Sequence, residues 1–183
     1  MTTKIAPIVV ALVGNSGSGK TYASLQLGKK EGYNTIVSFT TRPMREGETN
    51  GVEHWFVSPE DVPDKSEMCA YTNFGGYEYW TTWSQFSACD CVHVYVIDEK
   101  GLVDLMSKES SPFRFHFITV KITRENLTGT DAERIARDNN RMYLSEDFYD
   151  IVLHNDSTLE EFDKKIERLH QLLLRPTNKH QII

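Results

Sequence analysis

Residues 7–21, PIVVALVGNSGSGKT, decide the fold of this chain of 183 residues. An apolar run of strand length leads into GNSGSGKT (14–21), which matches the phosphate-loop pattern G-x-x-x-x-G-K-[ST]. Glycines in such a loop let successive backbone N–H groups turn towards an anion, and the N-terminus of a following helix adds partial positive charge. The stretch therefore predicts a nucleoside-triphosphate site, in which Lys20 reaches the β- and γ-phosphates and the Thr21 hydroxyl meets Mg²⁺. The remaining loop contacts are assigned to Gly14, Asn15, Ser16, Gly17, Ser18 and Gly19.

Strand and helix patterns alternate along the rest of the chain. Strands are predicted at 7–14, 34–39, 91–98, 114–122 and 149–155, and helices at 20–31, 101–109, 131–146 and 158–175. The last helix carries an apolar stripe of Leu159, Phe162, Ile166, Leu169 and Leu173. This order predicts an α/β fold with three α/β/α layers around a five-stranded parallel sheet.

Composition limits the partners. A net charge of −6 argues against nucleic acid and anionic membranes as partners, and no run approaches the roughly 18 apolar residues of a membrane span. The three cysteines, Cys69, Cys89 and Cys91, are odd in number and include no C-x-x-C pair. They give no disulfide framework or zinc site, Cys89 and Cys91 are predicted to be buried thiols, and a reducing, cytoplasmic location is expected.

A second anion site is predicted in SFTTRPMREGETNGVEHWFVS (38–58), which begins where the second strand ends. Two guanidinium groups three residues apart, on Arg42 and Arg45, can converge on one phosphate, each with a planar fork of donors. The alternative is an exposed loop in which the arginines pair with Glu46 and Glu48. Beside an intact phosphate loop, the anion site is the favoured interpretation.

This segment resembles the S-x-T-T-R-x-x-R-x-G-E-x-x-G-x-x-Y-x-F-V-S segment of guanylate kinases. Further similar segments follow in the family's order: NFGGYEYWTT (73–82), VIDEKG (96–101), GTDAERIAR (129–137) and YDIVLHNDSTLEE (149–161). The resemblance implies a single domain over 1–183 with three parts. These are a core (1–39, 83–122 and 146–183), a nucleoside-monophosphate-binding subdomain (40–82) and a helical lid (123–145).

The resemblance also implies an activity, the Mg²⁺-assisted in-line transfer of a phosphoryl group from ATP to GMP or dGMP, by a monomer or homodimer. It places the acceptor phosphate on Arg42, Arg45, His54 and Tyr79, and the acceptor base near Ser38 and Thr81. Asp98 would lie near the acceptor or the hydrated Mg²⁺, and Asn155 near adenine. Lid arginines would stabilise the transferred charge; the candidates are Arg134, Arg137 and Arg141, which share one helix face at i, i+3 and i+7. A solvated face that balances Asp131, Glu133 and Asp138 is the alternative.

Five positions depart from the family pattern: His54 replaces Tyr, Ala70 the Glu that reads guanine, Val96 a carboxylate, Trp80 a Gly and Thr128 an Arg. An imidazole can still donate a hydrogen bond to phosphate, more strongly when charged. Trp80 would crowd or cover the base pocket. Whether Glu67 or Glu78 replaces the lost carboxylate is open. A kinase with another or broader base preference therefore remains an alternative, as do, more weakly, a ribose-bisphosphate kinase and a non-catalytic domain that binds phosphoproteins.

Overall fold

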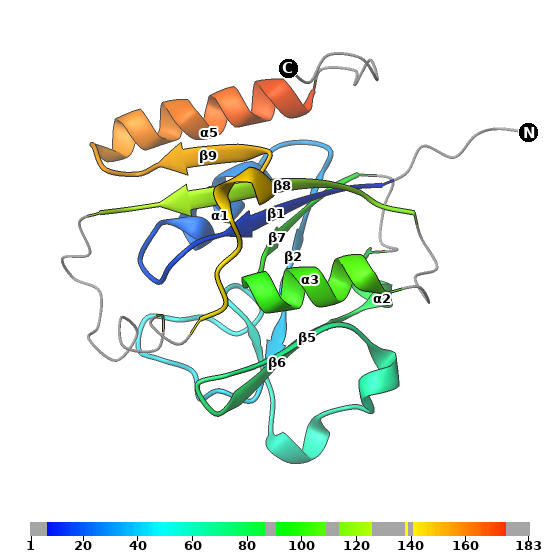
Figure 1. The fold of residues 1–183 in the computed structure, drawn as a ribbon. Helices are drawn as coiled ribbons and strands as arrows, with labels where there is room; N and C mark the ends of the chain where they lie inside the picture. The colour runs from blue at the N-terminus through cyan, green and yellow to red at the C-terminus, as the bar shows by residue number, and fades with distance from the viewer. Residues whose placement is uncertain (1–6, 87–90, 109–113, 126–137, 139–140, 175–183) are drawn as a thin grey trace, which may run out of the picture.

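The computed structural model describes residues 7–86, 91–108, 114–125, 138 and 141–174. Its core is a five-stranded sheet in the order β2-β7-β1-β8-β9, and every neighbouring pair is parallel (Figure 1). The strands are β1 (Ile8–Val13), β2 (Tyr33–Ile36), β7 (Val92–Val96), β8 (His116–Thr123) and β9 (Ile151–His154). The predicted α/β fold with a parallel core sheet is confirmed.

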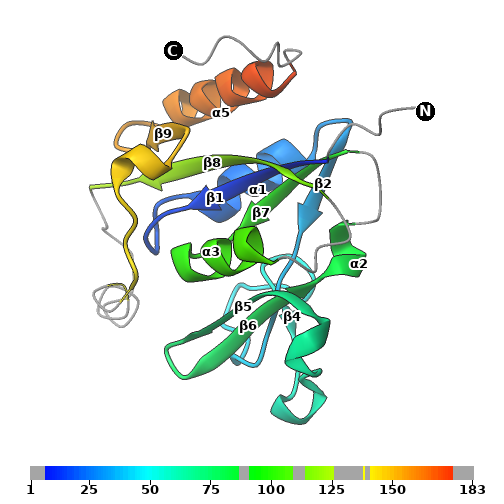
Figure 2. The same ribbon diagram turned by 45° about the vertical axis from the view of Figure 1, so that its right-hand side comes forward.

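Helices cover both faces of this sheet (Figure 2). On one face, α1 (Lys20–Gly28) and α5 (Leu159–Leu173) pack against Val10 and Leu12 of β1. On the other face, α3 (Glu99–Ser107) and the short α2 (Trp83–Phe86) pack against Val9 and Ala11. Burial on both faces explains why β1 reads as a continuous apolar run instead of an alternating one.

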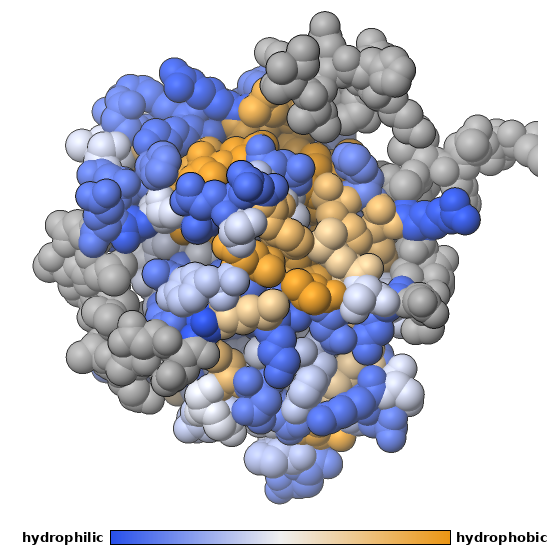
Figure 3. Space-filling model, in the orientation of Figure 1, coloured by the Kyte–Doolittle hydropathy of each residue, from blue (hydrophilic) through white to orange (hydrophobic). Residues whose placement is uncertain are grey.

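The apolar stripe of α5 is confirmed for Phe162, Ile166, Leu169 and Leu173, which are all buried. It is wrong for Leu159, which is 59% exposed at the first residue of the helix, one turn before the core contact begins. Figure 3 shows hydrophobic side chains gathered over β8 and β9, next to α5. A groove between β9 and α5 lies at this edge of the sheet, lined in part by Ile151 and Leu153.

A second sheet, in the order β4-β3-β6-β5, lies beyond the carboxyl end of β2. Its strands are β3 (Phe39–Thr40), β4 (Trp55–Phe56), β5 (Met68–Phe74) and β6 (Tyr77–Thr82), and the 3₁₀ turns η1 (Pro59–Asp61) and η2 (Lys65–Glu67) precede β5. The predicted strand at 34–39 is therefore divided, because the chain leaves the core sheet after Ile36 and pairs in the second sheet from Phe39. The core helix α3 packs against β5 and so connects the two sheets.

Two expectations from the sequence need correction. The helix predicted at 131–146 lies mostly outside the described residues, but 141–145 are irregular and a 3₁₀ turn, η3 (Glu146–Phe148), follows. Cys91 is disulfide-bonded, so a free thiol there is wrong, whereas Cys69 is free and buried. Among the described residues, no helix has the length and apolar character that crossing a membrane requires.

Candidate functional site

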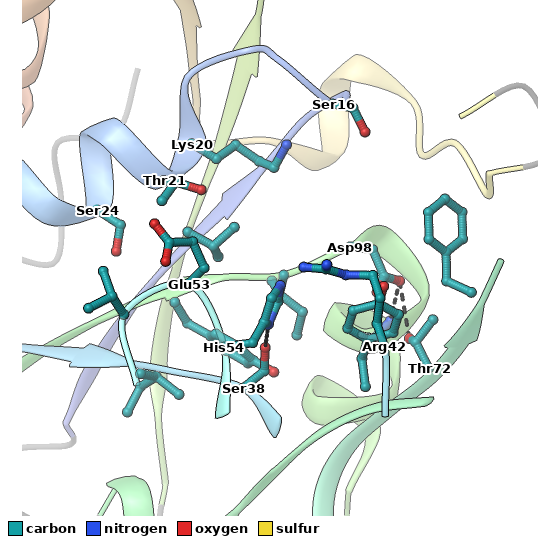
Figure 4. Close-up of a pocket in the computed structure, with 18 of the residues that line it drawn as sticks. Ser16, Lys20, Thr21, Ser24, Ser38, Arg42, Glu53, His54, Thr72 and Asp98 are labelled. Carbon is teal, nitrogen blue, oxygen red and sulfur yellow. Dashed lines mark hydrogen bonds between the residues drawn. The ribbon is translucent and has the colours of Figure 1, made fainter. Parts of the chain in front are cut away.

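A cavity of about 400 Å³ lies between the phosphate loop and the second sheet (Figure 4). It brings together most of the residues predicted from the sequence. From the ATP set it is lined by Ser16, Gly17, Gly19, Lys20 and Thr21, and from the acceptor set by Ser38, Arg42, Arg45, His54, Tyr79 and Asp98. Arg141 also lines it, whereas Gly14, Asn15, Ser18, Thr81 and Asn155 do not. Arg134 and Arg137 lie outside the described residues.

The phosphate loop is held by close backbone contacts. A Cβ atom on Gly14 would lie 2.1 Å from the carbonyl oxygen of Ile122, so only glycine fits there. Lys20 Nζ donates to the Asn15 carbonyl oxygen at 2.7 Å, which folds this side chain over the loop. Asn155 Nδ2 donates to the Ser18 carbonyl oxygen at 2.9 Å. Asn155 thus braces the loop from behind instead of facing the cavity.

A carboxylate lies on the phosphate loop. The backbone N–H of Ser16 donates to Asp138 Oδ2 at 2.6 Å, and the Ser16 hydroxyl donates to Oδ1 at 3.3 Å. Asp138 is 6% exposed and belongs to the segment predicted as the lid. The loop's N–H group therefore holds an anion in this structure, as the glycine-rich sequence predicts for a phosphate.

The Arg42 guanidinium is buried and paired with Glu48. Nη1 and Nη2 each donate to a different oxygen of that carboxylate at 2.9 Å, in a bidentate geometry. Glu48 also accepts from the backbone N–H of Arg45 at 2.8 Å. Burial acts to raise the pKa of Glu48, but the hydrogen bonds from Arg42 and Arg45 outweigh it and the pKa is lowered. The sequence offered two interpretations, an anion site or arginines paired with glutamate. Glu48 does pair with Arg42, and both arginines also line the cavity, as an anion site requires.

His54 is a neutral group of this cavity. Burial, followed by the nearby charge of Arg42, lowers the pKa of His54 from 6.5 to about 4. Its Nδ1 lies 2.8 Å from the Ser38 hydroxyl, and its ring packs edge-on against Phe56 and Tyr79. Burial and the charge of Arg42 therefore act against the charged imidazole considered from the sequence.

One wall of the cavity is formed by β5 and the start of α3. Asp98 is the N-cap of α3, and its Oδ1 accepts from the Gly101 backbone N–H at 2.9 Å. The Thr72 hydroxyl donates to the same oxygen at 3.2 Å. Ala70 lines the cavity beside Thr72 without adding a polar side-chain group. Asp98 thus supplies a carboxylate to this wall of the cavity.

The structure shows where Glu67, Glu78 and Trp80 lie relative to the cavity. Glu67 is exposed on η2, and Glu78 accepts a hydrogen bond from the Tyr71 hydroxyl at 2.9 Å. Neither glutamate lines the cavity, so neither replaces the carboxylate missing at Ala70. Trp80 stacks on Phe39 and does not line the cavity either, so the expectation that it crowds the base pocket is wrong.

Thr81 lies behind the cavity wall. It has no exposed surface, and its hydroxyl contacts the Tyr95 hydroxyl at 3.2 Å and Cys69 Sγ at 3.3 Å. Burial raises the pKa of Cys69 to about 11, so this thiol is protonated at neutral pH. Thr81 thus does not line the cavity, whereas its hydrogen-bond partner Tyr95 does.

Arg141 is committed to a buried ion pair. Its Nε donates to Glu99, and its Nη1 donates to the Gly14 carbonyl oxygen at 2.6 Å. The two side chains are only 7% and 3% exposed. Because residue 141 lies in irregular backbone, the shared helix face predicted for the three arginines does not extend to it. Arg141 ties the phosphate loop to α3.

Four site residues were not singled out from the sequence: Glu48, Thr72, Glu99 and Asp138. Glu48 and Asp138 left a signal, because each was considered as a charge partner of nearby arginines. Thr72 and Glu99 act across separations of 26 and 42 residues, which no local pattern records.

The comparisons with known proteins agree with this geometry. The family model for guanylate kinase matches residues 6–174. A guanylate kinase of Neisseria gonorrhoeae is 53% identical over 67 residues, which are 34% of this chain and 33% of that protein. One of Novosphingobium aromaticivorans is 30% identical over 189 residues, covering 92% of this chain and 83% of that protein.

Some of the alignments are short. In two of them this chain covers only 28% and 33% of the relative's own length, which is about a third. A crystal structure of guanylate kinase from Anaplasma phagocytophilum superposes with a TM-score of 0.67. That match covers 93% of this chain and 88% of the other chain at 20% identity, and it shows a shared fold.

Proposed function

Since this chain belongs to the guanylate kinase family, we propose that it transfers the γ-phosphoryl group of ATP to GMP or dGMP. One observation carries the proposal: a single cavity is lined both by the phosphate loop and by Arg42 and Arg45. A donor and an acceptor phosphate can therefore meet inside it. A cytoplasmic location, where ATP and nucleoside monophosphates occur together, is part of the same proposal.

The side chains support transfer by positioning and charge. Lys20 and the backbone N–H groups of the loop would hold the β- and γ-phosphates of ATP. Arg42, oriented by Glu48, and Arg45 would bind the acceptor phosphate from the opposite wall, with further hydrogen bonds from His54 and Tyr79. Fixing the two phosphates in line lowers the barrier without a covalent intermediate.

A magnesium ion fits this donor set only together with nucleotide. The described residues contain no group of three His, Cys, Asp or Glu side chains that could hold a metal alone. The Thr21 hydroxyl lines the cavity beside Lys20, and Mg²⁺ commonly combines few protein ligands with substrate phosphates and water. Thr21 would hold the ion, which when bound neutralises charge on the phosphate oxygens.

The acceptor end supports a base with hydrogen-bond donors on its edge. Asp98 presents a carboxylate there, and Ser38 lines the opposite side near His54. A carboxylate accepts from N–H groups and repels the carbonyl oxygens of uracil or thymine. This favours guanine over the pyrimidine bases that lack an amino group.

A coupled assay of ADP release over all common nucleoside and deoxynucleoside monophosphates tests the proposal. We expect turnover with GMP and dGMP that requires Mg²⁺ and is lost in Lys20→Met. The same variant should still bind GMP, because Lys20 faces the donor. Failure of every monophosphate to accelerate ADP release, with GMP bound at the cavity, would instead indicate a non-catalytic binding domain.

A further inference from the structure

We propose that Thr72 is a specificity-determining residue, which acts with Asp98 to recognise the two adjacent N–H donors on the edge of guanine. The inference rests on the proposed function, since it concerns how that site reads its acceptor. It begins from an arrangement of atoms in the cavity where β5 meets the first turn of α3 (Figure 4).

The two side chains present two acceptors together. Within the described residues, the Asp98 side chain accepts two hydrogen bonds, one from Gly101 N and one from Thr72 Oγ1. Both of them end on Oδ1. The second carboxylate oxygen is therefore left to accept from a ligand. A hydroxyl that donates its proton keeps its lone pairs as acceptors. Because Thr72 donates to Asp98, its oxygen is also restricted to accepting from anything else in the cavity.

The pair is held rigidly. Thr72 is 4% exposed in the middle of β5, opposite Tyr79 of β6, and Asp98 is fixed as the N-cap of α3. A Cβ atom on Gly101 would lie 3.1 Å from Thr72 Oγ1, so the first turn of α3 packs directly on this hydroxyl. Donor and acceptor roles are thus set before a ligand binds, and such preorganisation strengthens discrimination.

The acceptor pair matches one common purine. Guanine carries N1–H and the N2 amino group side by side, so both of its donors can meet Thr72 Oγ1 and Asp98 Oδ2. Adenine places an N1 lone pair beside its amino group, and that lone pair would face an acceptor. A buried polar group left without a partner weakens binding about 10- to 100-fold. Since Ala70 offers no polar side-chain group, Thr72 takes the place of a second carboxylate.

Two variants test this. Thr72→Val keeps the shape and burial of the side chain but removes the hydroxyl, whereas Thr72→Ser keeps the hydroxyl. We expect the ratio of kcat/KM for GMP to that for AMP to fall at least about 10-fold in Thr72→Val and to stay within about threefold of the parent in Thr72→Ser. The KM for ATP should not change. If Thr72 has a merely structural role, Thr72→Val would lower kcat/KM equally for GMP and AMP. An unchanged ratio would overturn the proposal.

A second variant and a second readout keep the proposal testable if Thr72→Val does not fold or no turnover occurs. Asp98→Asn keeps the cap but turns the free oxygen into a donor amide, and it should also lower the GMP-to-AMP ratio at least about 10-fold. Calorimetric affinities for GMP and AMP give the ratio without catalysis. If the parent protein binds GMP selectively but transfers no phosphate, that result contradicts the proposed function and leaves this inference intact. Unchanged affinity ratios in both variants would contradict the inference alone.

Discussion

The Asp138 carboxylate accepts a 2.6 Å hydrogen bond from the backbone N–H of Ser16, inside the phosphate loop and 122 residues away in the sequence. An oxygen anion thus occupies a donor that the motif provides for phosphate. ATP must displace this carboxylate or share the loop with it, and like charges resist sharing.

We expect Asp138→Ala to tighten ATP binding. Removal of a competing charge-assisted hydrogen bond of about 1.5–3 kcal/mol corresponds to at most a 10- to 100-fold lower Kd. Isothermal titration calorimetry with MgATP and no acceptor measures it. Asp147→Ala, at an exposed aspartate of the 3₁₀ turn η3, serves as a control for the loss of one negative charge. Unchanged or weaker ATP binding in Asp138→Ala would show that the carboxylate does not compete with phosphate.

Arg42 should dominate acceptor binding. We expect Arg42→Ala to lower kcat/KM for GMP about 10- to 100-fold, because charged hydrogen bonds to phosphate are lost. Steady-state kinetics with varied GMP measures the effect, and Arg114→Ala, at an exposed arginine of the chain, is the control. Near-parental kcat/KM in Arg42→Ala would remove Arg42 from the phosphate site and leave it as the partner of Glu48.

Arg141→Ala should destabilise the protein by about 3–5 kcal/mol, because it leaves the buried Glu99 carboxylate without its partner. Urea unfolding measures the loss. The exposed pair of Lys164 and Glu161 provides a matched control, and Lys164→Ala should cost less than about 1 kcal/mol. The double variant Arg141→Met with Glu99→Gln should recover part of the stability. Equal small effects for the buried and exposed pairs would contradict this account of Arg141.

His54 makes stability depend on pH in a defined window. The pKa of His54 is about 4 in the folded protein, below its ordinary value of 6.5. Between these values the unfolded chain binds a proton that the folded protein does not. The free energy of unfolding therefore falls as the pH drops from 6.5 towards 4, by up to about 3 kcal/mol, and this contribution is fully present above 6.5.

Urea unfolding at several pH values, compared between the parent and His54→Gln, isolates this contribution from other titrating groups. The parent should lose more stability than the variant across the window. His154→Gln, at an exposed histidine, controls for the loss of any imidazole. Parallel pH profiles for the parent and His54→Gln would show that burial does not suppress protonation of His54.

Most of the fold could be predicted from local patterns. The core strands and the buried stripe of α5 follow from apolar spacing, which depends on each residue's near neighbours. The second sheet was missed as a sheet because two of its four strands contain only two residues, although β5 and β6 are longer. Leu159 was misassigned because periodicity continues past the point where a helix leaves the core.

The sequence by itself determined the phosphate loop, the order of strands and helices, and the two arginines that line the cavity opposite that loop. Each of these is encoded within a few consecutive residues whose spacing limits the backbone. Only the tertiary structure decided that Glu48 orients Arg42, that Asp138 lies on Ser16, and that Thr72 meets Asp98. Such pairings depend on how β5, α3 and the loop pack together, and charge and burial at these contacts are properties of the packed chain.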